Sequence, residues 1–399
     1  MRSIQDFDFK NKRALIRVDF NVPLDKSTFA VTDDSRLKAA IPTIKKILDD
    51  GGSVVLMSHL GRPKDGPDEK YSLKHIVKHL SELLEHDVKF AEDCIGDDVR
   101  LLALNLLPGE ILLLENLRFR PEEEKGDMDF AIQLSELGNV YVNDAFGTAH
   151  RAHASTTIVA SLYSPENKMA GFLLAAEVDA ANKVLNDHEK PFTAIIGGAK
   201  VSDKILILEK LVEKADHIIV GGGMAYTFIK AMGGDIGNSL CEEDKLDLAK
   251  QLIENAKTNG ATILLPVDSV IADKFDNDAA KDTCISNIIP TGWMGLDIGE
   301  KAIKDFSEVI LASKTILWNG PMGVFEMENF SNGTIQIAKT VAQATQNGAY
   351  SLVGGGDSVA ALNKFNLSDK VSYVSTGGGA MLEFFEGKIL PGVEALEKN

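Results

Sequence analysis

The stretch Ile218-Ile219-Val220-Gly221-Gly222-Gly223-Met224 decides the fold, because an apolar run passes directly into glycines and then into a helical pattern. The second half of the chain contains this unit four times, and the glycines that follow the four apolar runs are Gly197-Gly198, Gly221–Gly223, Gly354–Gly356 and Gly377–Gly379. Strands that alternate with helices in this way predict parallel sheets with helices on both faces. Such sheets bind ligands beyond the carboxyl ends of their strands, which is where these glycines lie.

The first half of the chain alternates in the same way but without the glycine clusters. Its short apolar runs are of the buried-strand type and lie at Ala14–Val18, Val54–Met57, Ile111–Leu114 and Val140–Val142. Two stretches carry apolar residues at helical spacing, Asp34–Asp50 and Ser72–Glu85, with Asp33, Asp34 and Ser72 as N-caps and Gly51 as a stop. The sequence therefore predicts an α/β protein with two doubly wound parallel sheets.

A helix is predicted between the two halves, over Gly171–Leu185. Its apolar stripe consists of Leu174, Val178, Ala181, Val184 and Leu185. Gly171 and Pro191 bracket this helix. The pattern is equally consistent with a rigid connector that has hinges at its ends and with an ordinary surface helix of one domain.

The composition excludes several classes of protein. The 399 residues include 59 Asp and Glu against 42 Lys and Arg, a formal net charge of −17, which argues against a nucleic-acid surface. No apolar run approaches the ~18–20 residues of a membrane span, and Met1–Lys10 has no signal-peptide pattern. Three widely spaced cysteines fit a reducing compartment. We therefore expect a cytoplasmic protein without nucleic-acid or membrane partners.

Arginine and glycine are segregated along the chain. All nine Arg lie in the first 151 residues, whereas 25 of the 34 Gly lie in residues 171–399. Arginine presents a planar fork that matches carboxylates and phosphates. Glycine-rich turns at helix N-termini present bare backbone N–H groups to the same anions. We infer that the first half binds a small anion through side chains and the second binds phosphates through its backbone.

The arginine-rich half places polar residues just after each of its predicted strands. These residues are Asp19 and Asn21, His59 and Arg62, Arg118, and Arg151, while Arg36 lies in the first turn of a predicted helix. The carboxyl ends of parallel strands meet at one edge of a sheet, so together these residues predict a pocket for a polyanion. His150 and His153 flank Arg151, but no third ligand lies at metal-binding spacing, so we favour anion contacts.

The glycine-rich half contains neither a Walker A loop nor a true GxGxxG fingerprint. Each glycine cluster alone is equally consistent with a tight turn. Lys200 and Lys204 are expected on one face of a helix that begins right after Gly197-Gly198, close to bound phosphates. Asp357 directly follows the third cluster, where a carboxylate could hold Mg²⁺ beside a phosphate.

Nine segments resemble those of the phosphoglycerate kinase family and occur in the family's order from near Ala14 to near Gly392. They read RVDFNVP, TDDSRLKAA, SHLGRPK, VNDAFGTAHRAH, IIGGAKVSDKI, VGGGMAYTF, WNGPMGVFE, VGGGDSVAA and STGGGAMLE. The resemblance implies transfer of a phosphoryl group between 1,3-bisphosphoglycerate and Mg-ADP, giving 3-phosphoglycerate and Mg-ATP. It also implies a triose-binding domain (1–170), a hinge helix (171–190), a nucleotide-binding domain (191–385) and a tail (386–399) that returns to the first domain.

The resemblance also implies the residues of the sites. The triose site would consist of Asp19, Asn21, Arg36, His59, Arg62, Arg118 and Arg151. The nucleotide site would consist of Gly197, Lys200, Lys204, Gly221, Gly222, Asn319, Glu326, Gly355, Asp357 and Ser358, with Asp357 holding Mg²⁺. Gly378 would lie at a helix N-terminus aimed at the transferred group. Leu117 and Arg120, where the family more often has Val and a His or Tyr, depart from its pattern beside Arg118.

The reaction requires no general base, because both oxygens that exchange the phosphoryl group are anionic. We expect Arg36, Lys200, Lys204 and the Gly377–Gly379 turn to stabilise the charge of the transferred group. If the substrates bind to different domains, these must close together before transfer, which also expels water.

Two other functions fit parts of the sequence. A nicotinamide-dependent dehydrogenase would use glycine turns on parallel sheets, but it predicts a GxGxxG with an acid ~20 residues on, and that pattern is missing. A hinged, non-enzymatic anion-binding protein would leave Lys200, Lys204 and Asp357 unexplained. We therefore expect a kinase that acts on small molecules, as a monomer.

Overall fold

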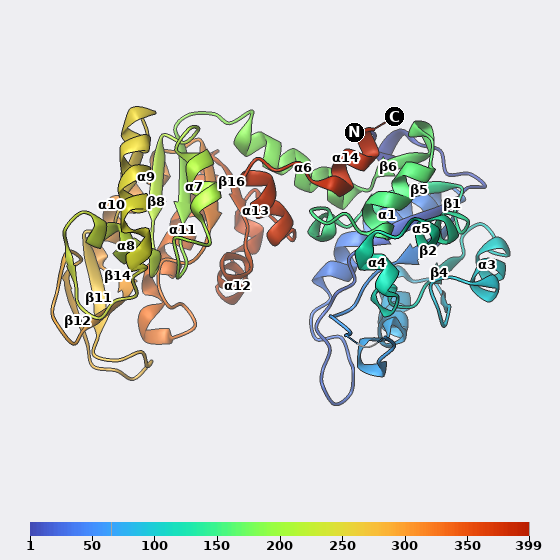
Figure 1. Ribbon diagram of the computed structural model, residues 1–399, viewed down its shortest axis with the longest axis horizontal. Coiled ribbons are helices and arrows are strands. Elements are labelled where there is room, and N and C mark those ends of the chain that lie inside the picture. Colours follow the sequence, from blue (N-terminus) through green and yellow to red (C-terminus); the bar gives the residue numbers. More distant parts are fainter. Residues whose placement is uncertain (65, 399) are drawn as a thin grey trace. The chain divides into compact units, whose positions relative to one another are not determined.

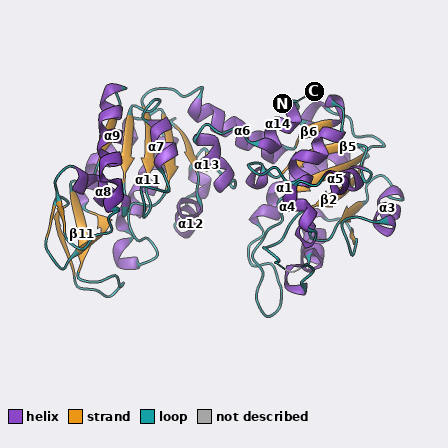
Figure 2. Ribbon diagram, in the orientation of Figure 1, coloured by secondary structure: helices purple, strands orange, loops and turns teal. Residues whose placement is uncertain are grey.

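The computed structural model describes residues 1–64 and 66–398 (Figure 1). They divide into two compact units. Unit 1 comprises Met1–Asp179 together with the chain from Ile389 onward, and unit 2 comprises Ala180–Lys388. Figure 2 shows strands enclosed by helices in each unit. Over the described residues, no helix is both long and apolar enough to cross a membrane.

Unit 1 is built on a parallel sheet that has six strands within the described residues, in the order β3-β4-β2-β1-β5-β6. The strands are β1 (Arg13–Val18), β2 (Ser53–Met57), β3 (Val88–Phe90), β4 (Ile111–Leu113), β5 (Val140–Asp144) and β6 (Lys168–Ala170). Ile16 of the central strand β1 is in register with Leu56 on one side and with Val142 on the other. All three are fully buried, as expected of a sheet covered on both faces.

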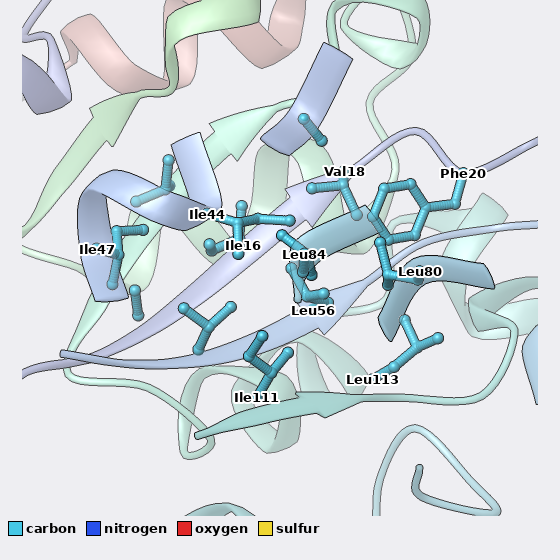
Figure 3. Packing of buried hydrophobic residues seen from close by; sticks show 14 of the residues in the cluster. Ile16, Val18, Phe20, Ile44, Ile47, Leu56, Leu80, Leu84, Ile111 and Leu113 are labelled. Atoms are coloured by element: carbon cyan, nitrogen blue, oxygen red, sulfur yellow. The ribbon is translucent and has the colours of Figure 1, made fainter. Parts of the chain in front are cut away.

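Helices cover both faces of this sheet. They are α1 (Ser35–Asp49), α2 (Val77–Leu84), α3 (Asp97–Leu104), α4 (Pro121–Lys125), α5 (Met128–Ser135) and α14 (Pro391–Glu397), together with the first part of α6 (Phe172–Leu185). Ile44 and Ile47 of α1 and Leu80 and Leu84 of α2 pack with the strands in one apolar cluster (Figure 3). Fully burying each such side chain contributes about 1.5–3 kcal/mol, so this layer firmly fixes the strand ends that carry the site.

Unit 2 contains a second parallel sheet with six strands in the described chain, in the order β10-β8-β7-β15-β16-β17. The strands are β7 (Phe192–Ile196), β8 (His217–Val220), β10 (Thr262–Leu264), β15 (Thr315–Asn319), β16 (Tyr350–Val353) and β17 (Tyr373–Val374). Numbered in chain order, they run 3-2-1-4-5-6, the order of dinucleotide-binding folds, whose ligands bind where the order reverses. That point lies between β7 and β15.

The helices of unit 2 are α7 (Ile205–Leu211), α8 (Met224–Ala231), α9 (Leu246–Thr258), α10 (Glu300–Ala312), α11 (Asn332–Gln346), α12 (Gly356–Lys364) and α13 (Gly379–Phe385). Smaller sheets that the sequence analysis did not predict complete the unit. Strands β12 (Lys281–Ile285), β11 (Asp268–Ala272) and β14 (Met294–Ile298) form an antiparallel sheet, and β9 (Asp235–Ile236) pairs with β13 (Ile288–Ile289).

The predicted fold class, two doubly wound parallel α/β sheets, is confirmed. The predicted helix over Ser72–Glu85 differs at its start, where Leu73–Ile76 form a 3-10 turn capped by the Ser72 side chain before α2 begins. Helix α6 is continuous from Phe172 to Leu185, and the division into units falls inside it.

Candidate active site

The polar residues predicted after the strands of unit 1 do gather at one edge of its sheet. Asp19, just beyond β1, accepts a hydrogen bond from Nη1 of Arg36 at 2.7 Å, and Arg36 lies in the first turn of α1. The Oδ1 of Asn21 accepts from the Gly61 amide at 2.8 Å. Arg118 donates from Nη1 to the Gly61 carbonyl, also at 2.8 Å. The Gly61 turn after β2 thus ties the ends of β1 and β4 together.

Asp19 and His59 influence each other's charge. Burial alone would raise the pKa of Asp19, but His59, Arg36 and Arg17 outweigh it and hold that pKa below its ordinary value. Burial lowers the pKa of His59 well below its ordinary value of 6.5, and Arg17, Arg118 and Arg36 lower it further against the opposing effect of Asp19. At neutral pH, Asp19 is therefore ionised and the His59 ring is uncharged.

The remaining arginines of the predicted triose site differ in their burial. The side chain of Arg118 is only 7% exposed; burial lowers its pKa, as do Arg17 and Arg151, while Glu124, with Oε1 3.1 Å from its Nε, raises it. Arg151 donates from Nε to Nε2 of His150 at 3.2 Å. Arg62 is exposed, and it makes no hydrogen bond or ion pair with the other six residues within the part of the chain described. The structure therefore places Arg36 and His59 beside Asp19 and joins Asn21 to Arg118 through Gly61. Arg151 lies close enough to affect the charge of Arg118, whereas Arg62 is exposed on the loop after β2.

Two buried charged residues of this region were not predicted as site residues. Arg17 lies on β1, is fully buried and has its Nη2 3.2 Å from Nδ1 of His59. Glu123 lies on α4, is fully buried and accepts two hydrogen bonds from Ser155. Arg17 sits inside the RVDFNVP segment, and an arginine within an apolar strand is the signal that could have identified it.

Arg120, the departure from the family pattern beside Arg118, does not join this group. It forms an ion pair with Asp93, and both side chains are about two-fifths exposed, at 41% and 42%. The substitution therefore adds no cation to the cluster of Asp19, Arg36 and Arg118.

In unit 2, glycines allow the backbone to approach closely at the point where the strand order reverses. A Cβ atom on Gly197, just beyond β7, would lie 2.0 Å from the Pro321 carbonyl oxygen beyond β15. Gly222 has a φ of +68°, and a Cβ there would lie 2.5 Å from the Gly198 carbonyl oxygen. Gly221 donates to the Ile196 carbonyl at 2.9 Å. These turns can only be this tight without side chains.

The prediction that Lys200 and Lys204 share a helix face is wrong. Helix α7 begins only at Ile205, so Lys204 is its N-cap and Lys200 lies in the preceding loop. The reason is a distant residue: Glu242 accepts from the Ser202 amide at 3.0 Å and from its hydroxyl at 2.6 Å, which holds this segment in turns. Lys200 is exposed.

Lys204 is instead directed to the end of β15. Its Nζ donates to Oδ1 of the buried Asn319, whose Nδ2 donates to the Gly354 carbonyl at 2.9 Å. Burial lowers the pKa of Lys204, and the nearby carboxylates Asp203, Asp357 and Glu386 oppose that effect. A half-buried lysine without a close carboxylate partner is well suited to pair with a phosphate.

The third glycine cluster leads into α12. Gly355, with a φ of +91°, is the N-cap, and Asp357 lies exposed in the first turn. Ser358 is buried, and its Oγ accepts from the Gly320 amide at 2.5 Å. The fourth cluster places Gly378, with a φ of +51°, at the N-cap of α13.

A cavity of 460 Å³ opens beside these turns. Of the predicted nucleotide residues, Gly222, Glu326 and Asp357 line it. Its apolar wall was not predicted and comes largely from the antiparallel strands and their neighbours, namely Tyr226, Leu240, Phe275, Met294, Leu296 and Val324. The cavity thus has an apolar wall on one side and glycine turns with Asp357 on the other. A ligand with a flat ring and phosphate groups requires such a site.

The fold is that of an α/β protein with two doubly wound units. One unit offers side-chain cations, and the other offers glycine turns and a lysine. Together these features define the class of enzymes that transfer phosphoryl groups. Comparison with known proteins identifies the family. The sequence model of the family described as "Phosphoglycerate kinase" matches residues 4–388. Phosphoglycerate kinase of Porphyromonas gingivalis is 52% identical over 99% of this chain and all of its own length. The cytosolic phosphoglycerate kinase of Nicotiana tabacum is 53% identical over 99% of this chain and 98% of its own length.

A solved structure agrees with these relatives. The structure of phosphoglycerate kinase from Coxiella burnetii superposes with a TM-score of 0.91 at 42% identity, covering 99% of this chain and 98% of its own. The chain belongs to the phosphoglycerate kinase family. The resemblance found in the sequence and the expected enzyme class, a kinase, are thereby confirmed, whereas nothing favours a dehydrogenase or a non-enzymatic binding protein.

Proposed function

We propose that this chain transfers a phosphoryl group reversibly between 1,3-bisphosphoglycerate and ADP, with the triose on unit 1 and the nucleotide on unit 2. The observation that carries this assignment is the different chemistry of the two sheet edges. The unit 1 edge carries Arg36 beside Asp19 and His59, with Arg118 at the Gly61 turn and Arg151 near Arg118. The unit 2 edge has glycine turns, Lys204 and a cavity of 460 Å³.

On unit 1, the guanidinium groups bind the carboxylate and phosphate of the triose, because their planar forks match both. Asp19 fixes the orientation of Arg36 through their 2.7 Å contact. Asn21 and His59 complete the site, and exposed Arg62 reaches it from the loop after β2. We assign the triose site to the seven residues expected from the sequence.

On unit 2, the apolar wall of the cavity takes the adenine ring, and Glu326 at its rim takes the ribose. The phosphates extend over the glycine turns towards Lys204, Asn319 and Ser358. Lys200, from the exposed loop before α7, also contacts the phosphates. Gly197, Gly221, Gly222 and Gly355 serve by allowing the close approach of strand ends and ligand, since the amides of the first three already donate to backbone carbonyls.

The Mg²⁺ ion that the family normally uses fits Asp357. Among the described residues, no three or more His, Cys, Asp or Glu side chains cluster as metal ligands. Mg²⁺ is commonly held by one or two carboxylates and the substrate phosphates, and the exposed Asp357 in the wall of the phosphate end of the cavity suits that mode. When bound with the nucleotide, the ion neutralises part of the phosphate charge.

The chemical step needs charge stabilisation rather than proton transfer. Both exchanging oxygens are anionic, and the transferred group passes through a loose, metaphosphate-like transition state. Arg36, Lys200, Lys204 and the backbone around Gly378 stabilise the charge on that group. Because the two substrates bind to different units, the units must close together before transfer, and we assign the hinge to residues 171–190. Small-angle scattering should show a smaller radius with both substrates than with either alone, and no contraction would contradict this closure.

The direct test is a coupled assay that measures ATP formed from 1,3-bisphosphoglycerate and ADP. We expect turnover that depends on magnesium and is abolished when ADP is omitted. Reduction of a nicotinamide in place of ATP formation would contradict the proposal. We further propose a cytoplasmic monomer, as the cytosolic relative and the formal charge of −17 suggest, and gel filtration tests its size.

A further inference from the structure

A chain of buried side chains runs beneath the triose site of unit 1, from α4 to His59. Glu123 accepts from the Ser155 amide at 2.9 Å and from the Ser155 hydroxyl at 2.6 Å. The same hydroxyl oxygen accepts from Nε of Arg17 at 2.8 Å, and Nη2 of Arg17 lies 3.2 Å from Nδ1 of His59. Glu123, Ser155 and Arg17 are fully buried, so these contacts do not compete with bulk water.

Each hydrogen bond in the series Glu123, Ser155, Arg17 and His59 can have its donor on one side only. A guanidinium has donors but no acceptor, so Arg17 donates both to Ser155 and to Nδ1 of His59. The hydroxyl proton of Ser155 then points at Glu123, whose carboxylate oxygens only accept. Since Nδ1 of His59 must offer a lone pair to Arg17, the proton of the neutral ring lies on Nε2.

Among the described residues, Arg17 is the one hydrogen-bond partner of Nδ1 of His59. The Oδ1 of Asp19 lies 3.9 Å from it, beyond hydrogen-bond distance. Burial raises the pKa of Glu123 above its ordinary value, and the opposing effects of Arg17 and Ser155 limit that rise, so both partners favour the charged form of Glu123. Within the described chain, Nε2 of His59 makes no hydrogen bond, which leaves it available to a ligand.

We propose that Glu123, Ser155 and Arg17 are positioning residues that fix His59 as the neutral Nε2–H tautomer, so that its ring presents an N–H donor to the bound triose. This inference rests on the proposed triose site. A neutral donor is useful there because Arg36, Arg118 and Arg151 already repel one another, and a further cation would add to that repulsion. The donor strengthens the grip on an anion without adding charge.

The test is a long-range proton–nitrogen correlation spectrum of the full chain, labelled with ¹⁵N in its histidines and free of ligand, with the His59 signals assigned by their loss in His59→Gln. We expect the wild type to show the Nε2–H tautomer. Ser155→Ala and Glu123→Gln should each free the Arg17 side chain to turn away from Nδ1 of His59 and so convert His59 to a mixture of tautomers. They should raise the KM for 3-phosphoglycerate by roughly 10-fold and leave the KM for ATP unchanged.

Glu122→Gln, the same change one residue earlier in α4, is the matched control and should alter neither the spectrum nor either KM. An Nδ1–H or doubly protonated His59 in the wild type would overturn the proposal. So would an unchanged tautomer in Ser155→Ala, which decides the matter if Glu123→Gln fails to fold. Failure of the proposed triose site is distinguishable, because His59→Gln would then leave the KM for 3-phosphoglycerate unchanged while the wild-type tautomer remained Nε2–H.

Discussion

Unit 1 and unit 2 share a doubly wound parallel sheet, but we propose that they hold anions by different means. Unit 1 offers charged side chains, such as Arg36, which donates to Asp19, and Arg118, which donates to the Gly61 turn. Unit 2 offers tight glycine turns at Gly197 and Gly222, together with the half-buried Lys204. The difference follows from the ligands: a small acid offers few contacts beyond its charges, whereas a nucleotide also offers a ring and a long phosphate chain.

The contrast also shows what each kind of site demands of the fold. A side-chain site tolerates small backbone changes, because long arginines can adjust. A backbone site does not, because each N–H position is set by the strand and turn that carry it. Changes of charge should therefore harm unit 1 most, and changes of shape should harm unit 2 most.

The largest effect is expected in the pH dependence of the free energy of unfolding, to which one buried carboxyl in each unit contributes. Burial raises the pKa of Asp144 in unit 1 and of Asp297 in unit 2 from 3.8 to about 7, although amides at the starts of α6 and α11 oppose it. Acids whose pKa is raised by folding bind their protons more tightly in the folded state. Their contribution to the free energy of unfolding is therefore complete near pH 4 and lost as the pH rises to about 7.

Asp144→Asn and Asp297→Asn should each remove the pH dependence of the free energy of unfolding that one carboxyl causes. This dependence is at most roughly 4 kcal/mol between pH 4 and pH 7. Urea unfolding between pH 4 and pH 8, with hydrogen exchange to report each unit, measures it. Each variant serves as the control for the other, since only the mutated unit should change. Wild-type and variant stabilities that stay parallel at all pH values would show that these carboxyls do not titrate abnormally.

Arg36→Ala tests the side-chain site. Turnover should fall on the order of 10²–10³-fold, because a donor to the transferred group is lost, while ADP affinity measured by calorimetry stays the same. Lys38→Ala is the matched control, since Lys38 lies in the same helix, is 60% exposed and pairs only with Asp34. ADP binding that weakened as much as the rate would contradict the role given to Arg36.

Lys204→Ala tests the half-buried lysine of the unit 2 site. Turnover should fall about 10²-fold, since Lys204 is held at the end of β15 by Asn319. Lys200→Ala should have a smaller effect because Lys200 is exposed on a loop. Steady-state kinetics of both variants, with Lys210→Ala as the control, show which of the two lysines contributes more to turnover. Equal losses in the two would show that the rigid placement of Lys204 is unimportant.

Gly222→Ala tests shape alone. The new Cβ would meet the Gly198 carbonyl oxygen at 2.5 Å, so the turn must shift, and the KM for ATP should rise about 10-fold. At Gly233 the φ is +90° and nothing lies within 4 Å of an added Cβ, so Gly233→Ala should lower stability by about 1–2 kcal/mol without changing that KM. A normal KM for ATP in Gly222→Ala would contradict the backbone site.

Sequence patterns correctly predicted the fold, and which polar residues follow the strand ends, wherever the determining residues are neighbours in the chain. Ile218–Met224 predicted strand, turn and the start of a helix, because apolar runs and glycines act locally. Charged residues after strand ends, such as Asp19 and Arg118, were predicted because parallel strands bring their ends to one edge.

Features that depend on distant contacts could not be predicted. Lys200 and Lys204 are not on a helix because Glu242, forty residues further on, holds Ser202 in a turn. The antiparallel strands beside the apolar wall are not followed by clusters of two or three glycines, and so the pattern used for the parallel strands did not detect them. Arg17 was correctly predicted to lie in a strand, but its role beside His59 was not, because its partners Ser155 and His59 are remote in sequence.

A crystal structure with 3-phosphoglycerate and Mg-ADP together tests directly whether the two substrates bind to different units. We expect the three-carbon acid at Arg36, Arg118 and Arg151 on unit 1, and the adenine ring inside the 460 Å³ cavity of unit 2. Both ligands bound to the same unit would contradict it.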